Sequence, residues 1–192
     1  MEQLMFQEHL VSTVNQKVLS LLAKFPDKEF YERQIARRIG IAYGSANRAL
    51  NQLYSSGAVK RRQEGNMFFY SVDACDPIII EFKRLLNMLL IEPLVEELKD
   101  VSARVVLYGS CAQGADTSSS DLDLFIVSHS TEEVLNAISR FRPPRGFEEI
   151  RVQPVVKSPL ELLQADVAGQ AFMGEVEKGI TLWERASIES RI

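Results

Sequence analysis

Residues 107–124 read LYGSCAQGADTSSSDLDL, and this stretch decides how the C-terminal half of the chain folds. The apolar run that ends at Leu107 predicts a strand, and Gly109-Ser110 predicts a sharp turn from that strand into a short helix. Gly109 lets the backbone approach a ligand closely. Ser110 and the amides at the start of the helix can donate hydrogen bonds to phosphate oxygens at the positive end of the helix.

A pair of acidic residues opens the next predicted strand, which runs from Asp121 to Val127. Asp121 and Asp123 are two residues apart, so on a strand both carboxylates face the same side. Two close carboxylates repel each other unless cations neutralise them. Two Mg²⁺ ions do so, and they also bridge a nucleoside triphosphate. The pattern therefore predicts a metal-dependent nucleotide site.

The spacing of these groups resembles a known family. Ten residues, Cys111 to Ser120, separate Gly109-Ser110 from Asp121-Leu122-Asp123. This arrangement resembles the polymerase β nucleotidyltransferase superfamily, and most of all its small MNT-type (minimal nucleotidyltransferase) members, over about residues 100–185. The resemblance implies transfer of NMP, in most cases AMP from ATP, onto a hydroxyl.

The same resemblance assigns roles to individual residues. It implies nucleotide binding by Gly109, Ser110, Asp121 and Asp123, and it makes Asp121 and Asp123 the catalytic residues and the ligands of two Mg²⁺ ions. MNT-type proteins commonly act as antitoxins that modify a partner HEPN ribonuclease toxin. A protein hydroxyl is therefore one acceptor that the resemblance implies.

The third acid of the family is missing from its expected place. That acid sits on the next strand in a pattern of the form apolar-Asp-apolar-apolar, and the matching stretch here is Val152-Gln153-Pro154-Val155. Gln153 cannot act as a base. Glu149 would face the same side of a strand as Gln153, but it lies four residues earlier, about 13 Å away along the strand. The sequence leaves open an active transferase, a regulator whose domain only senses nucleotide, and a structural protein with neither activity.

The remaining C-terminal elements alternate between strands and helices. We expect a helix over 131–141, a strand over 149–156, a helix that begins after the N-cap Ser158, a helix over 171–177 and a strand over 180–183. These elements predict an α/β nucleotidyltransferase domain with a mixed sheet over residues 93–192. With the N-terminal half, the fold class is α+β.

The N-terminal half predicts a winged helix-turn-helix domain over residues 1–92. Helical periodicity covers 6–25, 31–39 and 43–55, and two β-like runs follow at 59–63 and 67–72. The pattern resembles ArsR- and MarR-like regulators. The resemblance places the helix 43–55 in the DNA major groove and the hairpin on phosphates. The implied DNA contacts are Tyr43, Ser45, Asn47, Arg48 and Asn51 on the helix, and Lys60, Arg61 and Arg62 on the hairpin. The alternative is a winged helix that contacts protein.

A mostly apolar helix is expected over 77–91, followed by a new helix from Pro93 to about Lys99. The first of these helices either packs inside the monomer or forms a two-fold interface. We favour a homodimer, because helix-turn-helix proteins commonly read two half-sites.

Composition agrees with a globular protein in two parts. The 192 residues carry 26 Asp plus Glu and 22 Lys plus Arg, a net charge of −4. Residues 1–75 hold 10 basic and 7 acidic residues, a net of +3, which leaves −7 for the rest. A membrane span needs about 20 apolar residues, and no such run or signal peptide is visible. With only Cys75 and Cys111, the latter expected to pack, we expect a reduced, cytoplasmic protein.

Overall fold

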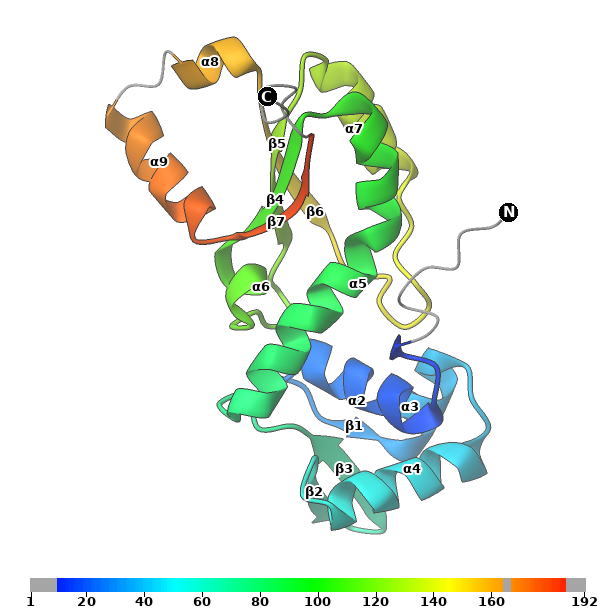
Figure 1. The fold of residues 1–192 in the computed structure, drawn as a ribbon. Coiled ribbons are helices and arrows are strands. Elements are labelled where there is room, and N and C mark those ends of the chain that lie inside the picture. Colours follow the sequence, from blue (N-terminus) through cyan, green and yellow to red (C-terminus); the bar gives the residue numbers. More distant parts are fainter. Residues whose placement is uncertain (1–9, 164–166, 186–192) are drawn as a thin grey trace, which may run out of the picture.

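The computed structural model of the chain describes residues 10–163 and 167–185. The described elements form two groups, and one long helix joins them (Figure 1). The N-terminal group contains helices and a small antiparallel sheet, and the C-terminal group is a mixed sheet with helices on both faces. The prediction of an α+β protein with a mixed C-terminal sheet is confirmed.

The N-terminal elements lie close to their predicted positions. They are α2 (Val14–Lys24), β1 (Phe30–Tyr31), α3 (Glu32–Ile39), α4 (Tyr43–Ser55), β2 (Lys60–Glu64) and β3 (Met67–Ser71). The strands are ordered β1-β3-β2 and all pair antiparallel. The sequence did not predict β1, because a strand of two residues has no alternation and forms only by pairing with β3.

The helix predicted over residues 6–25 can be compared with the structure only from residue 10 onward. The expected start, Phe6, lies outside the described residues, and α2 begins at Val14. Thr13 caps it: the Gln16 amide donates to Thr13 Oγ1 at 3.3 Å, and Gln16 Oε1 accepts from the Thr13 amide at 2.9 Å. This reciprocal capping box satisfies two helix-end donors, so α2 starts at the cap.

The prediction of two helices around Pro93 is wrong. One helix, α5, runs from Pro77 to Val101 with Pro93 inside it. Proline removes one helical hydrogen bond, but Leu90, Ile91 and Leu94 are buried on both sides of it and hold the helix in place. Neither α5 nor any other helix in the described ranges is long and apolar enough to cross a membrane.

The C-terminal sheet has the strand order β6-β5-β4-β7. Its elements are β4 (Arg104–Tyr108), α6 (Gly109–Gln113), β5 (Leu122–Val127), α7 (Thr131–Arg140), β6 (Val152–Lys157), α8 (Pro159–Leu163), α9 (Val167–Glu177) and β7 (Ile180–Glu184). Only β5 and β6 are parallel within this sheet. In Figure 1, α5 and α7 lie on one face and α9 on the other. The strand β6 begins three residues later than predicted, and α9 begins four residues earlier.

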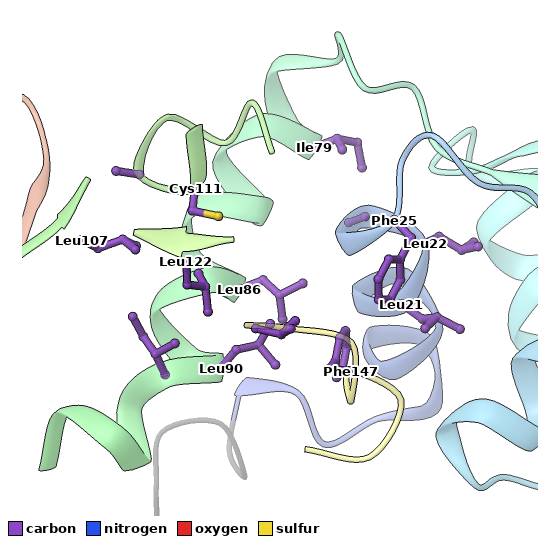
Figure 2. Close-up of a cluster of buried hydrophobic side chains, with 14 of the residues drawn as sticks. Leu21, Leu22, Phe25, Ile79, Leu86, Leu90, Leu107, Cys111, Leu122 and Phe147 are labelled. Carbon is purple, nitrogen blue, oxygen red and sulfur yellow. The ribbon is translucent and has the colours of Figure 1, made fainter. Parts of the chain in front are cut away.

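A single core cluster spans both groups of elements. Figure 2 shows Leu21 of α2 and its C-cap Phe25 on one side, Leu107 and Leu122 of the sheet on the other, and Leu86 of α5 between them. Burying each such side chain contributes about 1.5–3 kcal/mol.

The helix α5 supplies much of this core. Its apolar side chains Ile79, Leu86, Leu89 and Leu90 are buried within the chain, whereas Ile78 is 77% exposed and Leu85 is 39% exposed. Most of the apolar circumference of α5 is therefore filled by the monomer itself.

Candidate active site

The turn from β4 into α6 brings the backbone against an acidic side chain. Gly109 has a φ of 68°, a left-handed value that side chains disfavour. A Cβ at this position would lie 2.7 Å from Asp123 Oδ2. Glycine is therefore favoured by the backbone angle, and its missing Cβ leaves room for the Asp123 carboxylate in this position. Ser110 follows in the first turn of α6.

The two predicted acids lie together at the start of β5. Asp123 is on the strand, paired in register with Tyr108 of β4, and Asp121 immediately precedes the strand. Burial raises the pKa of the Asp123 carboxyl, and the negative charge of Asp121 raises it further. The neighbouring carboxylates of Asp121 and Asp123 concentrate negative charge at this point, which favours a bound cation.

The face of the sheet that carries Asp123 is covered beyond the acids by α9. The ring of Phe172 on α9 lies edge-on to Tyr108, with centroids 5.6 Å apart, and also packs on Phe125. Burial, followed by the charge of Asp123, raises the pKa of the Tyr108 hydroxyl. Asp123 thus lies at the rim of a small apolar cluster, where charge is less screened than in open solvent, whereas Asp121 is exposed.

Gln153 lies where the sequence spacing puts the missing third acid. On β6 it pairs in register with Asp123, and its side chain is exposed. Its neighbour Pro154 is tolerated because β6 is an edge strand. Glu149 does not replace the missing acid, because it pairs instead with Arg38 at 3.0 Å and Lys28 at 3.6 Å in the N-terminal group.

The donor set of the site fits a magnesium ion that is completed by its substrate. In the described ranges no group of three or more His, Cys, Asp or Glu side chains forms a metal cluster. Asp121 and Asp123 remain as hard oxygen donors. Mg²⁺ is commonly held by one or two carboxylates together with water and substrate phosphates. The residues therefore fit Mg²⁺ bound together with a triphosphate.

The helix α4 presents part of its predicted DNA-contact face to solvent. Arg48 and Asn51 are exposed, while Ser45 and Asn47 are half-buried. Glu32 of α3 accepts hydrogen bonds from Tyr43 Oη at 2.5 Å and from Asn47 Nδ2 at 2.9 Å. These two side chains are therefore held by α3.

The predicted hairpin cations differ in their partners. Lys60 pairs with Asp73 at 2.9 Å, and Arg62 pairs with Glu29 at 2.6 Å and with Glu64 at 2.7 Å. The guanidinium of Arg61 lies instead over the rings of Tyr54 and Phe68, at 4.0 and 4.6 Å from their centroids. Carboxylates thus neutralise two of the three cations that the sequence assigns to phosphate contact.

Cys111 is a packing residue rather than a reactive thiol. Its side chain is fully buried, and burial raises the pKa of the thiol to about 12. The position at a helix start, which by itself lowers a thiol pKa, is outweighed by desolvation.

Sequence reasoning missed a buried polar cluster behind α6. Lys24, Lys83, Asn87 and Asp116 come from α2, from α5 and from the loop after α6, and all four are buried. The available signal was a lysine inside the apolar pattern of α2, because lysine is almost never fully buried without a partner.

Comparison with known proteins identifies a family for the part of the chain that contains the acid pair. A sequence model of the family described as "Nucleotidyltransferase domain" matches residues 90–189. No curated protein and no solved structure gives a significant match. Members of the family generally use a nucleoside triphosphate and a divalent metal ion. The match covers 100 of the 192 residues and includes Gly109, Ser110, Asp121 and Asp123. The chain therefore belongs to the nucleotidyltransferase-domain family.

Proposed function

We propose that this protein transfers a nucleoside monophosphate from a magnesium–NTP complex, with ATP as the donor, to a hydroxyl acceptor. The observation that carries the proposal is the pairing of Asp121 and Asp123 beside the Gly109-Ser110 turn. Two neighbouring carboxylates are suited to binding a metal–triphosphate complex, and the pKa of one of them, Asp123, is raised by burial and by the charge of Asp121.

Each residue of the site has a chemical role in this proposal. Ser110 and the first amides of α6 donate to phosphate oxygens, and Asp121 and Asp123 hold Mg²⁺. The ion neutralises charge on the attacking and leaving oxygens when it is bound. The acceptor oxygen forms a bond to the α-phosphorus, the bond to the bridging oxygen breaks, and pyrophosphate leaves. The acceptor proton passes to solvent, since the Gln153 amide is not basic.

A nucleotide-sensing regulator is the second candidate function. Gln153 favours it, because the register places this amide beside Asp123, where a general base would otherwise lie. Loss of a general base typically lowers a rate by about 10²–10⁴-fold. The two candidates differ in one observable: a transferase releases pyrophosphate, and a sensor binds the nucleotide without releasing it.

Calorimetry with ATP, with and without Mg²⁺, tests the nucleotide site. The full chain is compared with the double variant Asp121→Asn/Asp123→Asn, which keeps side-chain size and removes both charges. We expect Mg²⁺-dependent binding that the double variant lacks. Binding that is equal in both proteins, or no binding of any NTP by the wild type, contradicts the proposed site. A coupled pyrophosphate assay then separates transferase from sensor.

We further propose that the N-terminal group is a winged helix that binds duplex DNA as a homodimer. Supporting features are the net charge of +3 over residues 1–75 and the exposed Arg48 on α4. A cavity of about 780 Å³ also lies between α3 and the loop before β6, and Arg33, Arg37 and Arg145 are among its lining residues. Guanidinium groups gathered around a hollow suit backbone phosphates.

The salt dependence of DNA binding tests this second proposal. Each phosphate contact contributes about 0.9 to the slope of log K against log salt concentration. We expect Arg37→Ala to reduce the slope by about that amount. Arg62→Ala is the matched control, because Glu29 and Glu64 already neutralise this cation. Equal slopes for the wild type and Arg37→Ala contradict the contact. Light scattering at the same concentrations tests the homodimer.

A further inference from the structure

The loop between α6 and β5 ends at Asp121 and is the least regular part of the candidate site. It spans residues 114–121 and contains no strand. Two of its side chains are held by α2 and by the turn that follows α2, both in the N-terminal group. Neither attachment has a role in the nucleotide binding proposed above.

The first attachment is a buried ionic cluster. Lys24 Nζ lies 2.7 Å from Asp116 Oδ2, with 2% of the Lys24 side chain and none of the Asp116 side chain exposed. Lys24 also donates to Asn87 Oδ1 at 2.7 Å, and Asn87 Nδ2 donates to Asp116 Oδ1 at 3.1 Å. Lys83 donates to the carbonyl of Asp116. Because these partners surround Asp116 in a region of low dielectric, its side chain has one strongly preferred position.

The cluster continues to the backbone of the metal-binding acid. Asn87 Nδ2 donates to the carbonyl of Cys111 at 3.0 Å, and Cys111 Sγ donates to the carbonyl of Asp121 at 3.2 Å. A chain of hydrogen bonds therefore runs from Lys24 of α2 through α5 and α6 to the residue that carries the first carboxylate.

The second attachment lies three residues before Asp121. Asp27 accepts hydrogen bonds from the Ser118 amide at 2.7 Å and from Ser118 Oγ at 2.6 Å. Partial burial raises the pKa of Asp27, but the two bonds from Ser118 outweigh it, so the pKa lies below its usual value. Both bonds are charge-assisted, which makes them about twice as strong as neutral ones.

The sheet positions one acid of the pair and the loop positions the other. Asp123 lies within β5, and its ladder partners on both sides are Tyr108 and Gln153. Asp121 lies one residue before the first ladder position, Leu122. Its carboxylate direction therefore depends on the loop that α2 and Asp27 hold.

We propose that Asp27 and Lys24 are positioning residues of the nucleotide site, so that the N-terminal group helps to build the site in the C-terminal group. This inference rests on the proposed nucleotide binding. It assigns the Asp121 side of the site, and not the Asp123 side, to contacts made from α2 and the turn after it.

Asp27→Ala carries the test, because Asp27 is exposed and its loss leaves the core intact, whereas replacing the buried Lys24 endangers the fold. The matched control is Glu149→Ala, which removes another exposed contact between the two groups, at Arg38, without touching the loop. Asp27→Asn is the conservative variant, because its side chain keeps one acceptor oxygen.

Two measurements on the full chain are compared. Calorimetry gives the Kd for Mg–ATP, and NMR gives the exchange rate of the Ser120 amide, which bonds to the Thr117 carbonyl inside the loop at 3.1 Å. We expect Asp27→Ala to weaken Mg–ATP binding about 10-fold or more, the size of effect seen when support of a metal ligand is lost. Its Ser120 amide should exchange faster. Glu149→Ala should change neither quantity, and Asp27→Asn should lie between the wild type and Asp27→Ala.

A merely structural role for Asp27 predicts a different pattern, in which both alanine variants lower the melting temperature and neither changes the Kd. Unchanged Mg–ATP binding by Asp27→Ala overturns the inference, as does unchanged Ser120 exchange. If the wild type binds no Mg–NTP, the proposed function fails. In that case the exchange rate of the Ser120 amide alone tests the positioning of the loop. Faster exchange only in Asp27→Ala supports it, and equal exchange in all variants overturns it.

Discussion

Replacing Gly109 with alanine distinguishes backbone strain from the position of the Asp123 carboxylate. A side chain at the left-handed φ of 68° costs about 1–2 kcal/mol. In a chain of this size about 1 kcal/mol lowers Tm by about 2–4 °C, so we expect a loss of about 2–8 °C. The new Cβ also stands 2.7 Å from Asp123 Oδ2, so the carboxylate must turn away. Mg–ATP binding should then weaken about 10–100-fold, as when a metal ligand is misoriented.

Gly57→Ala is the matched control for this prediction. Gly57 has a φ of 78°, and a Cβ there meets no atom within 4 Å. It therefore suffers the same backbone strain without contacting the site. Thermal unfolding should show similar losses for both variants, and calorimetry should show weakened Mg–ATP binding only for Gly109→Ala. If the two variants bind Mg–ATP equally well, the assignment of Asp123 as a ligand of the metal–nucleotide complex is refuted.

Three further predictions concern the missing acid, the cysteines and the contact between the two groups. Gln153→Asp puts a carboxylate beside Asp123 in the strand register, and pyrophosphate release should rise by about 10²–10⁴-fold. An unchanged rate means that the absence of a base at this position does not limit the reaction. Cys75 is exposed and Cys111 is buried with its pKa raised to about 12, so a thiol reagent at pH 8 should titrate one cysteine in the folded chain and both in denaturant. The hydrogen bond from Arg38 lowers the pKa of the Glu149 carboxyl below its usual value of 4.5. The unfolded chain therefore binds a proton at Glu149 more readily than the folded chain does. The stability that Glu149 contributes is lost as the pH falls through its lowered pKa. Urea unfolding at pH 7 and near pH 3 should show a smaller acid-induced loss of stability for Glu149→Gln than for the wild type.

The candidate site was accessible from sequence because its parts are local. The spacing of two between Asp121 and Asp123 predicts that the two acids lie close together, although β5 begins only at Leu122, and counting along the next strand locates Gln153. In the structure Gln153 pairs with Asp123 in register. Gly109 shows the same locality: one residue type identifies a turn whose φ is 68°.

Contacts over long sequence separations could not be predicted in the same way. The sequence shows Arg62 as a hairpin cation, but its partner Glu29 lies 33 residues earlier. Lys24 and Asp116 are 92 residues apart, and nothing local marks them as a pair. In both cases the charge of the residue is evident, but its partner depends on which segments pack together.

Periodicity, turn residues and short spacings act between near neighbours, and they were sufficient to predict the order of most elements and the acid pair, whose motif carries the resemblance to the family. Two features could not be predicted from near neighbours. They are the continuity of α5 through Pro93 and the buried Lys24–Asp116 pair. Burial of apolar residues on both sides of Pro93 outweighs the one hydrogen bond that proline removes. The low dielectric between α2 and the loop makes a lysine there depend on its carboxylate. Such energies exist only once distant segments have packed, so they arise from the folded chain and not from any stretch of its sequence.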